Sequence, residues 1–206
     1  MKCYNYRVGG EYMYYHASQM KDIKILEPRI SNHNVPLIYF SLKRENVLVY
    51  LSNAIEKYCK ETGFSHSGKW HKWASYGFES DGTLIIDEYY PNALIDTYKG
   101  VSGYIYSAEN VSLNEDRINI SSAVTTSEPV VVENVEFIED AYDEIIRAAK
   151  TGLIKIRRYE EQSDKMLKWI EKTIRDEYKN AENEADYRHF LKAKFSFLND
   201  NKFNGE

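Results

Sequence analysis

Three residues in the first quarter of the chain have side chains and a spacing that could form a ligand site. His16 stands near the end of an aromatic run, YMYYHAS, and Tyr39 lies in the apolar run PLIYFS; Tyr50 follows Tyr39 by 11 positions. A histidine can donate a hydrogen bond, and a tyrosine ring offers apolar area with a polar tip. Taken singly, each is better explained as a packed or hydrogen-bonded structural residue. The hypothesis of a site therefore depends on the three together.

The elements that would position these residues are two strands and a helix. Residues 12–16 are rich in aromatic residues typical of strands, and residues 36–41 have the composition of a buried strand. From Lys43 onward the apolar residues recur at helical spacing, and Gly63 is a natural end for that helix. The apolar positions that define the helix are Val47, Leu51, Ala54 and Tyr58.

The rest of the chain alternates between strand and helix patterns. Further strands are expected at 70–78, 83–90, 104–106, 118–124, 129–135 and 153–159, and helices at 92–99, 137–149 and within 161–198. The first two of these strands flank Ser80-Asp81-Gly82, which indicates a hairpin. Because these elements follow no regular βαβ order, the sequence favours an α+β fold over a doubly wound parallel sheet.

The size and composition limit the classes of protein that need consideration. The chain has 206 residues, 43% of them hydrophobic, which is enough for one domain with a proper core. We assign residues 1–159 to that domain and residues 160–206 to a C-terminal helical extension packed on or beside it. The formal net charge of −5 argues against a general nucleic-acid-binding field. The 18 tyrosines suggest half-buried surfaces or a lined cleft.

Cysteine usage and hydropathy point to a cytoplasmic protein. Cys3 and Cys59 are the only cysteines and show no C-x-x-C spacing, so neither a disulfide framework nor a cysteine zinc site is supported. The start of the chain lacks an apolar signal core, and no run approaches the roughly 18 apolar residues of a membrane span. We therefore expect no membrane partner.

Several common catalytic motifs are absent from the sequence. It contains no G-x-G-x-x-G after a strand, no G-x-x-x-x-G-K-[ST], no H-E-x-x-H and no G-x-S-x-G. His66 and His71 lie close together, but no third ligand has suitable spacing for a metal. A metal cofactor is therefore not expected.

Two short segments carry a resemblance to a known superfamily. Tyr15-His16-Ala17-Ser18 resembles the first signature of the ADP-ribosyltransferases, in the branch of the poly(ADP-ribose) polymerases and the rifampicin-modifying enzymes. Ile38-Tyr39-Phe40-Ser41 resembles the second signature, and Tyr50 stands at the offset of a further tyrosine in the polymerase branch. The resemblance covers about residues 12–60 and extends loosely to 136; residues 140–206 lie outside it.

The resemblance implies a fold and a reaction. The fold would be an α+β, ADP-ribosyltransferase-like split β-sheet core with flanking helices. The reaction would move ADP-ribose from NAD to an unknown acceptor and release nicotinamide. His16 would donate a hydrogen bond to a ribose hydroxyl, and Tyr39 and Tyr50 would sandwich the nicotinamide. The NAD-binding residues it implies are His16, Ala17, Ser18, Tyr39, Ser41 and Tyr50. The backbone of Ala17 would pair with the nicotinamide amide, at a place where glycine is more usual and a Cβ narrows the pocket.

The resemblance also implies a catalytic carboxylate. Related enzymes place a glutamate at the start of a late strand, where it stabilises an oxocarbenium-like transition state. Glu128 matches best, since a polar lead-in precedes it and a β-branched run follows, although the proline directly after it is unusual. Glu88 and Glu109, each near a strand end, are the alternatives. The predicted catalytic set is His16, Tyr39 and Glu128.

Two other functions remain open. The same fold could act on an RNA 2′-phosphate, for which Arg29, Lys43 and Arg44 could supply positive charge, but the acidic balance of the chain argues against it. The chain could also be a non-enzymatic binding module that keeps the cleft and uses the C-terminal helices as a partner surface. Within the transferase hypothesis, a protein or small-molecule acceptor is favoured over nucleic acid.

Overall fold

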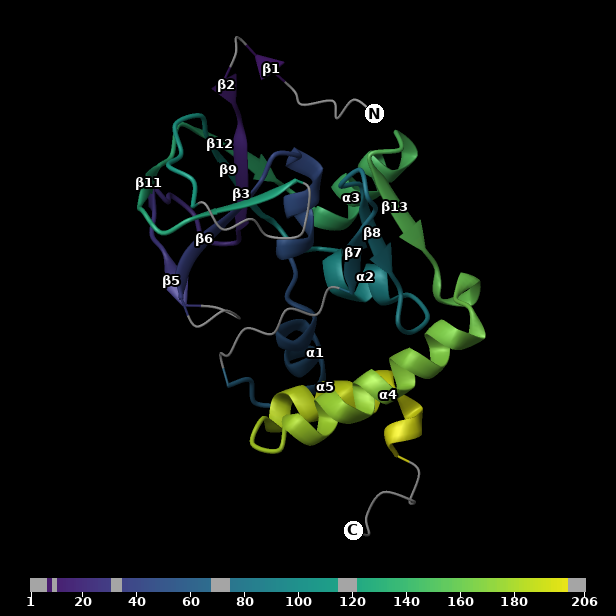
Figure 1. Ribbon diagram of the computed structural model, residues 1–206. Helices are drawn as coiled ribbons and strands as arrows, with labels where there is room; N and C mark the ends of the chain where they lie inside the picture. Colours follow the sequence, from purple (N-terminus) through teal and green to yellow (C-terminus); the bar gives the residue numbers. More distant parts are fainter. Residues whose placement is uncertain (1–6, 9–10, 31–34, 68–74, 115–121, 200–206) are drawn as a thin grey trace.

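The computed structural model describes residues 7–8, 11–30, 35–67, 75–114 and 122–199. It has mixed α+β architecture, with largely antiparallel sheets and five α-helices in the described part (Figure 1), so the predicted fold class is confirmed at that level. None of the helices found in this part of the chain is long and apolar enough to cross a membrane.

The main sheet contains the segments on which the predicted site depends. Its order is β10 (Ala123–Thr126), β6 (Pro36–Ser41), β3 (Tyr14–Ser18), β9 (Gly103–Ala108) and β12 (Asn134–Ile138), and β5 (Arg29–Ile30) also pairs with β6. All of these pairings are antiparallel. Two small ribbons complete this part of the molecule: β1 (Arg7–Val8) with β2 (Glu11–Tyr12), and β4 (Ile25–Leu26) with β11 (Val130–Val131).

The sheet is split between β3 and β6. In the described residues these neighbours share a single registered pair, Tyr15 with Ser41, whereas β3 and β9 share five pairs. The two strands therefore hydrogen-bond as a ladder only near that one pair. This split separates the strand that carries His16 from the strand that carries Tyr39.

The inner strands of the sheet are packed on both faces, whereas most of the edge strand β12 is exposed. One face packs against the 3₁₀-helix η1 (Arg44–Tyr50) and α3 (Ala141–Lys150), in a cluster that includes Leu48, Ile105 and Ile145. The other face, with Phe40 and Tyr106, packs against the β4–β11 ribbon. The sheet is thus held rigidly from both sides, as a binding site built on strands requires.

The predicted helix from Lys43 to Gly63 is wrong as a single helix. The structure divides it into η1 and α1 (Ala54–Thr62), with a break at residues 51–53. The tight 3₁₀ turns bury four consecutive residues, Asn46 to Val49, which a regular α-helix at a sheet surface would not do. Asn53 occupies the N-cap position of α1, although its side chain makes no capping hydrogen bond. Gly63 ends α1 in the left-handed conformation, as expected.

A second sheet carries the predicted hairpin. Strands β7 (Tyr76–Phe78) and β8 (Leu84–Asp87) pair antiparallel, and β13 (Ile154–Arg157) adds parallel to β8. Gly82 takes a φ of +77° in the turn, which confirms the hairpin expected around Ser80-Asp81-Gly82. Residues 70–74 of the predicted strand lie outside the described residues. The short helix α2 (Ala93–Tyr98) follows β8.

The predictions for residues 129–149 need correction. The expected single strand at 129–135 is divided into β11 and β12, and residues 137–138, expected to be helical, belong to β12. The helix α3 begins only at Ala141, because the Asp140 carboxylate accepts hydrogen bonds from the backbone N–H groups of Tyr142 and Asp143 and so caps it. The prediction of one strand overlooked the break between β11 and β12, and the prediction of the helix start overlooked the capping by Asp140.

The C-terminal segment forms η2 (Tyr159–Glu161), α4 (Asp164–Asn180), α5 (Ala185–Lys194) and η3 (Ser196–Leu198). Of these, α5 and η3 lie below α1 in the view of Figure 1. Phe190 and Leu191 of α5 share one buried cluster with Ile55 and Cys59 of α1. The Asp186 carboxylate also accepts hydrogen bonds from both the backbone N–H and the hydroxyl of Ser67. The extension therefore packs on the helix that follows Tyr50.

Candidate functional site

His16 bridges the split in the main sheet. Its Nδ1 lies 3.0 Å from the backbone carbonyl oxygen of Tyr39. A carbonyl oxygen can only accept, so Nδ1 must carry the proton, and in the neutral ring Nε2 is then an acceptor. This reverses the predicted direction of the ligand hydrogen bond: a ribose hydroxyl would donate to His16 rather than accept from it.

The surroundings of His16 favour its neutral form. The half-buried ring packs edge-on against Phe40, with ring centroids 6.0 Å apart. Burial lowers the pKa of His16, the hydrogen bond to Tyr39 partly offsets this, and the nearby charge of Arg29 lowers the pKa further. The imidazole is therefore neutral at physiological pH and suited to binding a hydroxyl group.

Tyr50, the last residue of η1, belongs to a group of tyrosines. Its hydroxyl accepts a hydrogen bond from the hydroxyl of Tyr76 at 3.3 Å, and their rings meet edge to face at 6.1 Å. Burial raises the pKa of Tyr50, and the nearby Tyr39 raises it further. The structure thus brings the two predicted tyrosines, from a strand and a 3₁₀-helix, within electrostatic reach of each other.

The backbone of Ala17 faces the split. Leu42 donates its N–H toward β10, to the Ser122 carbonyl at 2.8 Å, whereas the Tyr39 carbonyl points toward β3. The backbone groups of successive strand residues point alternately to the two neighbouring strands, so those of Ser41 face β3, as those of Tyr39 do. The backbone groups of Tyr15, the partner of Ser41, therefore face β6. Those of Ala17, two residues further along β3, face β6 as well. The Cβ of Ala17 is buried in the core cluster beside η1.

The two predicted serines have structural hydrogen bonds. The hydroxyl of Ser18 accepts from the N–H of Met20 at 3.1 Å, and the hydroxyl of Ser41 accepts from the N–H of Lys43 at 3.0 Å. Each stabilises the chain as it leaves its strand. Both hydroxyls keep a second lone pair and a donor for a ligand.

Glu128 is placed away from the other predicted catalytic residues. β10 runs antiparallel to β6, with Thr125 opposite Tyr39 and Thr126 opposite Ile38. Glu128 follows the end of this strand, about 10 Å along the chain from the position opposite Tyr39. Its side chain is exposed, and its N–H donates to the Thr126 hydroxyl. The structure brings His16 and Tyr39 together but does not bring Glu128 to them.

The two alternative glutamates are also elsewhere. Glu88 is buried behind β8, where its carboxylate accepts from the N–H of Leu94 at 3.0 Å and from the guanidinium of Arg158 at 3.2 Å. Glu109 follows Ala108, which pairs with Tyr14, whereas His16 pairs with Tyr106. Glu109 therefore lies three residues along β9 from the partner of His16.

The start of β10 carries a serine. Ser122 directly precedes the strand, its carbonyl continues the ladder to Leu42, and its buried hydroxyl accepts from the Asn46 side-chain amide at 2.9 Å. The resemblance implies a glutamate at the start of a late strand, and β10 is the late strand that pairs with β6. Among the described residues, Ser122 is the one that occupies this place.

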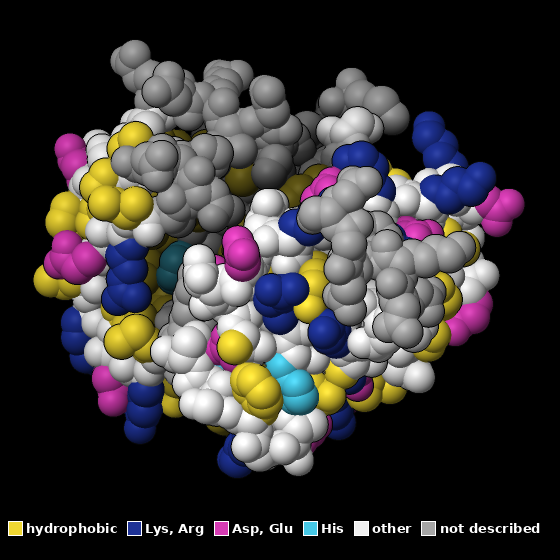
Figure 2. All heavy atoms as spheres, turned by 90° about the horizontal axis from the view of Figure 1, so that it is seen from below, with side chains coloured by type: hydrophobic (Ala, Val, Ile, Leu, Met, Phe, Trp, Pro, Cys, Tyr) yellow, Lys and Arg dark blue, Asp and Glu magenta, His cyan; other side chains and the backbone are white. Residues whose placement is uncertain are grey.

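Arg29 is the basic residue that the structure associates with His16. It pairs with Leu37 across β5 and β6, two residues before Tyr39, and its charge influences His16. The other two basic candidates are engaged elsewhere. Arg44 binds Glu136 through its Nε at 2.8 Å and also pairs with Glu144, and the ammonium of Lys43 donates to the Asp81 carbonyl. On the face drawn in Figure 2, basic side chains are interspersed with acidic and hydrophobic ones.

Sequence reasoning missed Tyr76 as a member of the site. It lay in a predicted strand, and the unusual number of tyrosines was the only signal that pointed to it. In the described residues, no group of three or more His, Cys, Asp or Glu side chains is placed to hold a metal ion.

Comparison with known proteins adds no constraint on this site. No protein-family model, curated protein or solved structure matches the chain.

Proposed function

We propose that this chain binds NAD in the split between β3 and β6 and transfers its ADP-ribose group to an acceptor. The observation that carries the proposal is the hydrogen bond from His16 to the Tyr39 carbonyl across the split, with Tyr50 close to Tyr39. The ring of His16 thereby meets the backbone of the Tyr39 strand where the ladder is interrupted, and Tyr50 lies close to Tyr39.

Each group has a specific part in binding. The rings of Tyr39 and Tyr50 stack on the flat, cationic nicotinamide, and the backbone of Ala17 pairs with its amide. The neutral Nε2 of His16 accepts a hydrogen bond from a ribose hydroxyl. Arg29 supplies positive charge for the anionic diphosphate.

The reaction breaks the bond between the ribose C1′ and the nicotinamide nitrogen. The bonding electrons leave with nicotinamide, which becomes neutral, and an oxocarbenium-like ribose forms. The acceptor then attacks C1′ and loses a proton. Stacking between the two rings fixes the orientation of the nicotinamide, and with it the geometry of the bond that breaks.

Two measurements on the purified protein test the proposal. Calorimetry measures NAD binding, and chromatography measures nicotinamide release. Tyr39→Ala and Tyr50→Ala should each weaken NAD binding, whereas Tyr12→Ala, at an exposed tyrosine of the neighbouring β2 strand, should not. Circular dichroism checks that all variants fold. Absence of NAD binding by the folded wild-type protein contradicts the proposal.

A second function is favoured by the carboxylate positions. Glu128 is exposed beyond β10, Glu88 is engaged by Arg158, and Ser122 stands at the strand start. This arrangement favours an NAD-binding module without transferase activity. The two functions differ in one readout: a binding module retains calorimetric NAD binding but releases no nicotinamide on prolonged incubation.

The role of Arg29 can be tested separately. Arg29→Gln should weaken binding of NAD and ADP-ribose and leave the affinity for free nicotinamide unchanged, because nicotinamide carries no phosphate. The matched control is Lys24→Gln, which removes one positive charge from an exposed residue of the neighbouring segment. Equal weakening for nicotinamide and NAD would show that Arg29 acts through the fold.

A further inference from the structure

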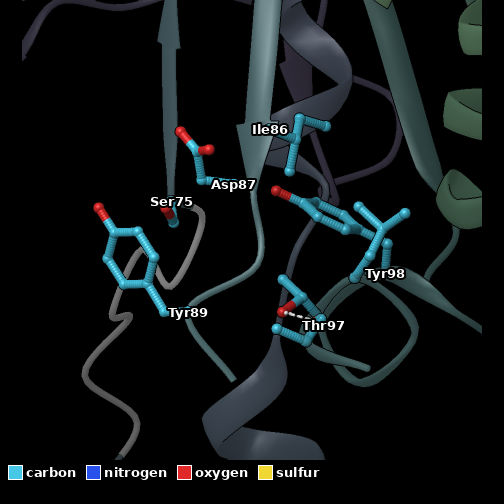
Figure 3. A pocket seen from close by; sticks show the side chains of 8 residues that line it. Ser75, Ile86, Asp87, Tyr89, Thr97 and Tyr98 are labelled. Carbon is cyan, nitrogen blue, oxygen red and sulfur yellow. Dashed lines mark hydrogen bonds between the residues drawn. The ribbon is translucent and has the colours of Figure 1, made fainter. Parts of the chain in front are cut away.

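A small cavity lies behind the tyrosine group, between the end of β8, helix α2 and Ser75 (Figure 3). The space open to the centre of a water molecule is about 10 Å³. A single water needs roughly 10–15 Å³ measured in this way, together with two to four polar partners. The cavity is therefore of the size that admits one water molecule and nothing larger.

Two hydroxyl groups that line the cavity, those of Tyr98 and Ser75, make no hydrogen bond of good geometry to a described residue. The Ser75 hydroxyl still lies against Tyr89, whose pKa is raised by burial and lowered in part by hydrogen bonding to Ser75, so the Tyr98 hydroxyl is the group that most needs a partner. Tyr98 is only 1% exposed, and Figure 3 shows its hydroxyl directed away from α2, toward the side of the cavity where Asp87 and Ser75 lie. A buried hydroxyl without a partner is strongly unfavourable, so such groups are normally satisfied by protein or by ordered water.

The other polar groups of the lining are already bound. The Thr97 hydroxyl donates to the Ala93 carbonyl at 2.7 Å. The Asp87 carboxylate accepts from Arg157 at 2.6 and 2.7 Å, and its Oδ1 accepts in addition from the side-chain amide of Gln162 at 3.1 Å, so Oδ2 is the oxygen that retains accepting capacity. Burial raises the pKa of Tyr98 far above neutrality, so its hydroxyl stays protonated and able to donate.

We propose that this cavity is a specific site for one ordered water, held between the hydroxyls of Tyr98 and Ser75 with Asp87 as a further acceptor. The water satisfies both hydroxyls and fills the space behind Tyr50, which lies close to Tyr98. It is a structural component of the wall behind the proposed nicotinamide site. The inference goes beyond the proposed function and does not depend on NAD binding.

The direction in which Tyr98→Phe shifts the thermal midpoint of unfolding tests whether this water is bound. If the water is bound, the substitution removes one of its partners and leaves a polar molecule poorly held, so the thermal midpoint falls. If the cavity is dry, the substitution deletes an unsatisfied hydroxyl, so the midpoint rises. Tyr106→Phe calibrates the scale, because the Tyr106 hydroxyl has a known partner, the Met20 carbonyl at 2.6 Å. A midpoint for Tyr98→Phe that is unchanged or raised overturns the proposal.

A high-resolution crystal structure provides the second readout. An electron-density peak within hydrogen-bonding distance of both hydroxyls in the wild type, absent or displaced in Tyr98→Phe, supports the site. Ser75→Ala should weaken the same peak from the opposite wall. A wild-type cavity with no density peak overturns the proposal, whatever the melting data show.

Discussion

At the scale of single residues, His16 has two hydrogen-bonding roles that substitutions can separate. Its Nδ1 joins β3 to β6 through the Tyr39 carbonyl, and its Nε2 is left to accept from a ligand. His16→Asn should keep the first and lose the second, because an asparagine amide can donate to the same carbonyl. His16→Ala loses both.

We expect both variants to weaken NAD binding by the worth of one hydrogen bond, about 0.5–1.5 kcal/mol, or roughly 2- to 12-fold in Kd. Only His16→Ala should also lower the free energy of unfolding, by a similar amount. Calorimetry and urea unfolding of the two variants give the two values. Equal stability losses for Asn and Ala would refute the tie to Tyr39.

The lowered pKa of His16 predicts a pH dependence of stability. Since burial favours the neutral ring, the unfolded chain binds more protons than the folded one below the ordinary histidine pKa of about 6.5. This contribution is complete above that pH and is lost as the pH falls toward the lower, folded-state pKa. The free energy of unfolding should therefore decrease more steeply on acidification in the wild type than in His16→Asn. Urea midpoints measured between about pH 7.5 and pH 5 check this, and parallel curves would contradict it.

At the scale of elements, the close approach of β9 to the end of η1 fixes where Tyr50 lies. A Cβ added at Gly103 would meet Leu51 Cδ2 at 2.5 Å and the Ser18 carbonyl at 3.1 Å. Leu51 directly follows Tyr50 and is fully buried. The absence of a side chain at Gly103 thus lets the 3₁₀-helix lie tightly on the sheet.

Gly103→Ala should therefore destabilise the fold by about 1–3 kcal/mol through overpacking. Gly77→Ala is the matched control, because a Cβ there has no neighbour within 4 Å and Gly77 also lies in a strand. Urea unfolding measures both changes. A cost for Gly103→Ala no larger than that for Gly77→Ala would show that η1 shifts freely.

The sequence was informative about elements and about one half of the site. The strand around Tyr39 was predicted with its observed bounds, because a compact apolar run has few alternatives. The helix around Tyr50 was not, because residues 47–58 keep helical spacing across a break that depends on local packing. The carboxylate could not be located, since its position depends on which end of β10 meets β6. That pairing is long-range, and no local pattern near Glu128 encodes it.

At the scale of the whole molecule, the C-terminal helices and the strand domain share a core. Lys194 of α5 shows how closely they are joined: its ammonium binds Asp96 at 2.7 Å and lies over the rings of Tyr58 and Tyr90. Phe190 is completely buried in the same cluster. These contacts predict that residues 160–199 unfold together with the rest of the described chain.

Phe190→Ala should lower the free energy of unfolding by about 3–5 kcal/mol while keeping a single transition. Phe137→Ala, at an exposed phenylalanine of β12, should cost far less. Differential scanning calorimetry distinguishes the outcomes. Two separate transitions, with only one of them moved by Phe190→Ala, would mean that the extension is independently folded.

Ligand entry into the split between β3 and β6 can also be followed by spectroscopy of its backbone amides. Its backbone groups on the β3 side, beyond the Tyr15–Ser41 pair, have no registered partner across the gap in the described residues. The amide of Ala17 is therefore a natural probe for hydrogen-exchange or chemical-shift measurements. It would register a ligand entering the split even if that ligand were never turned over, and so would separate occupancy of the site from chemistry there.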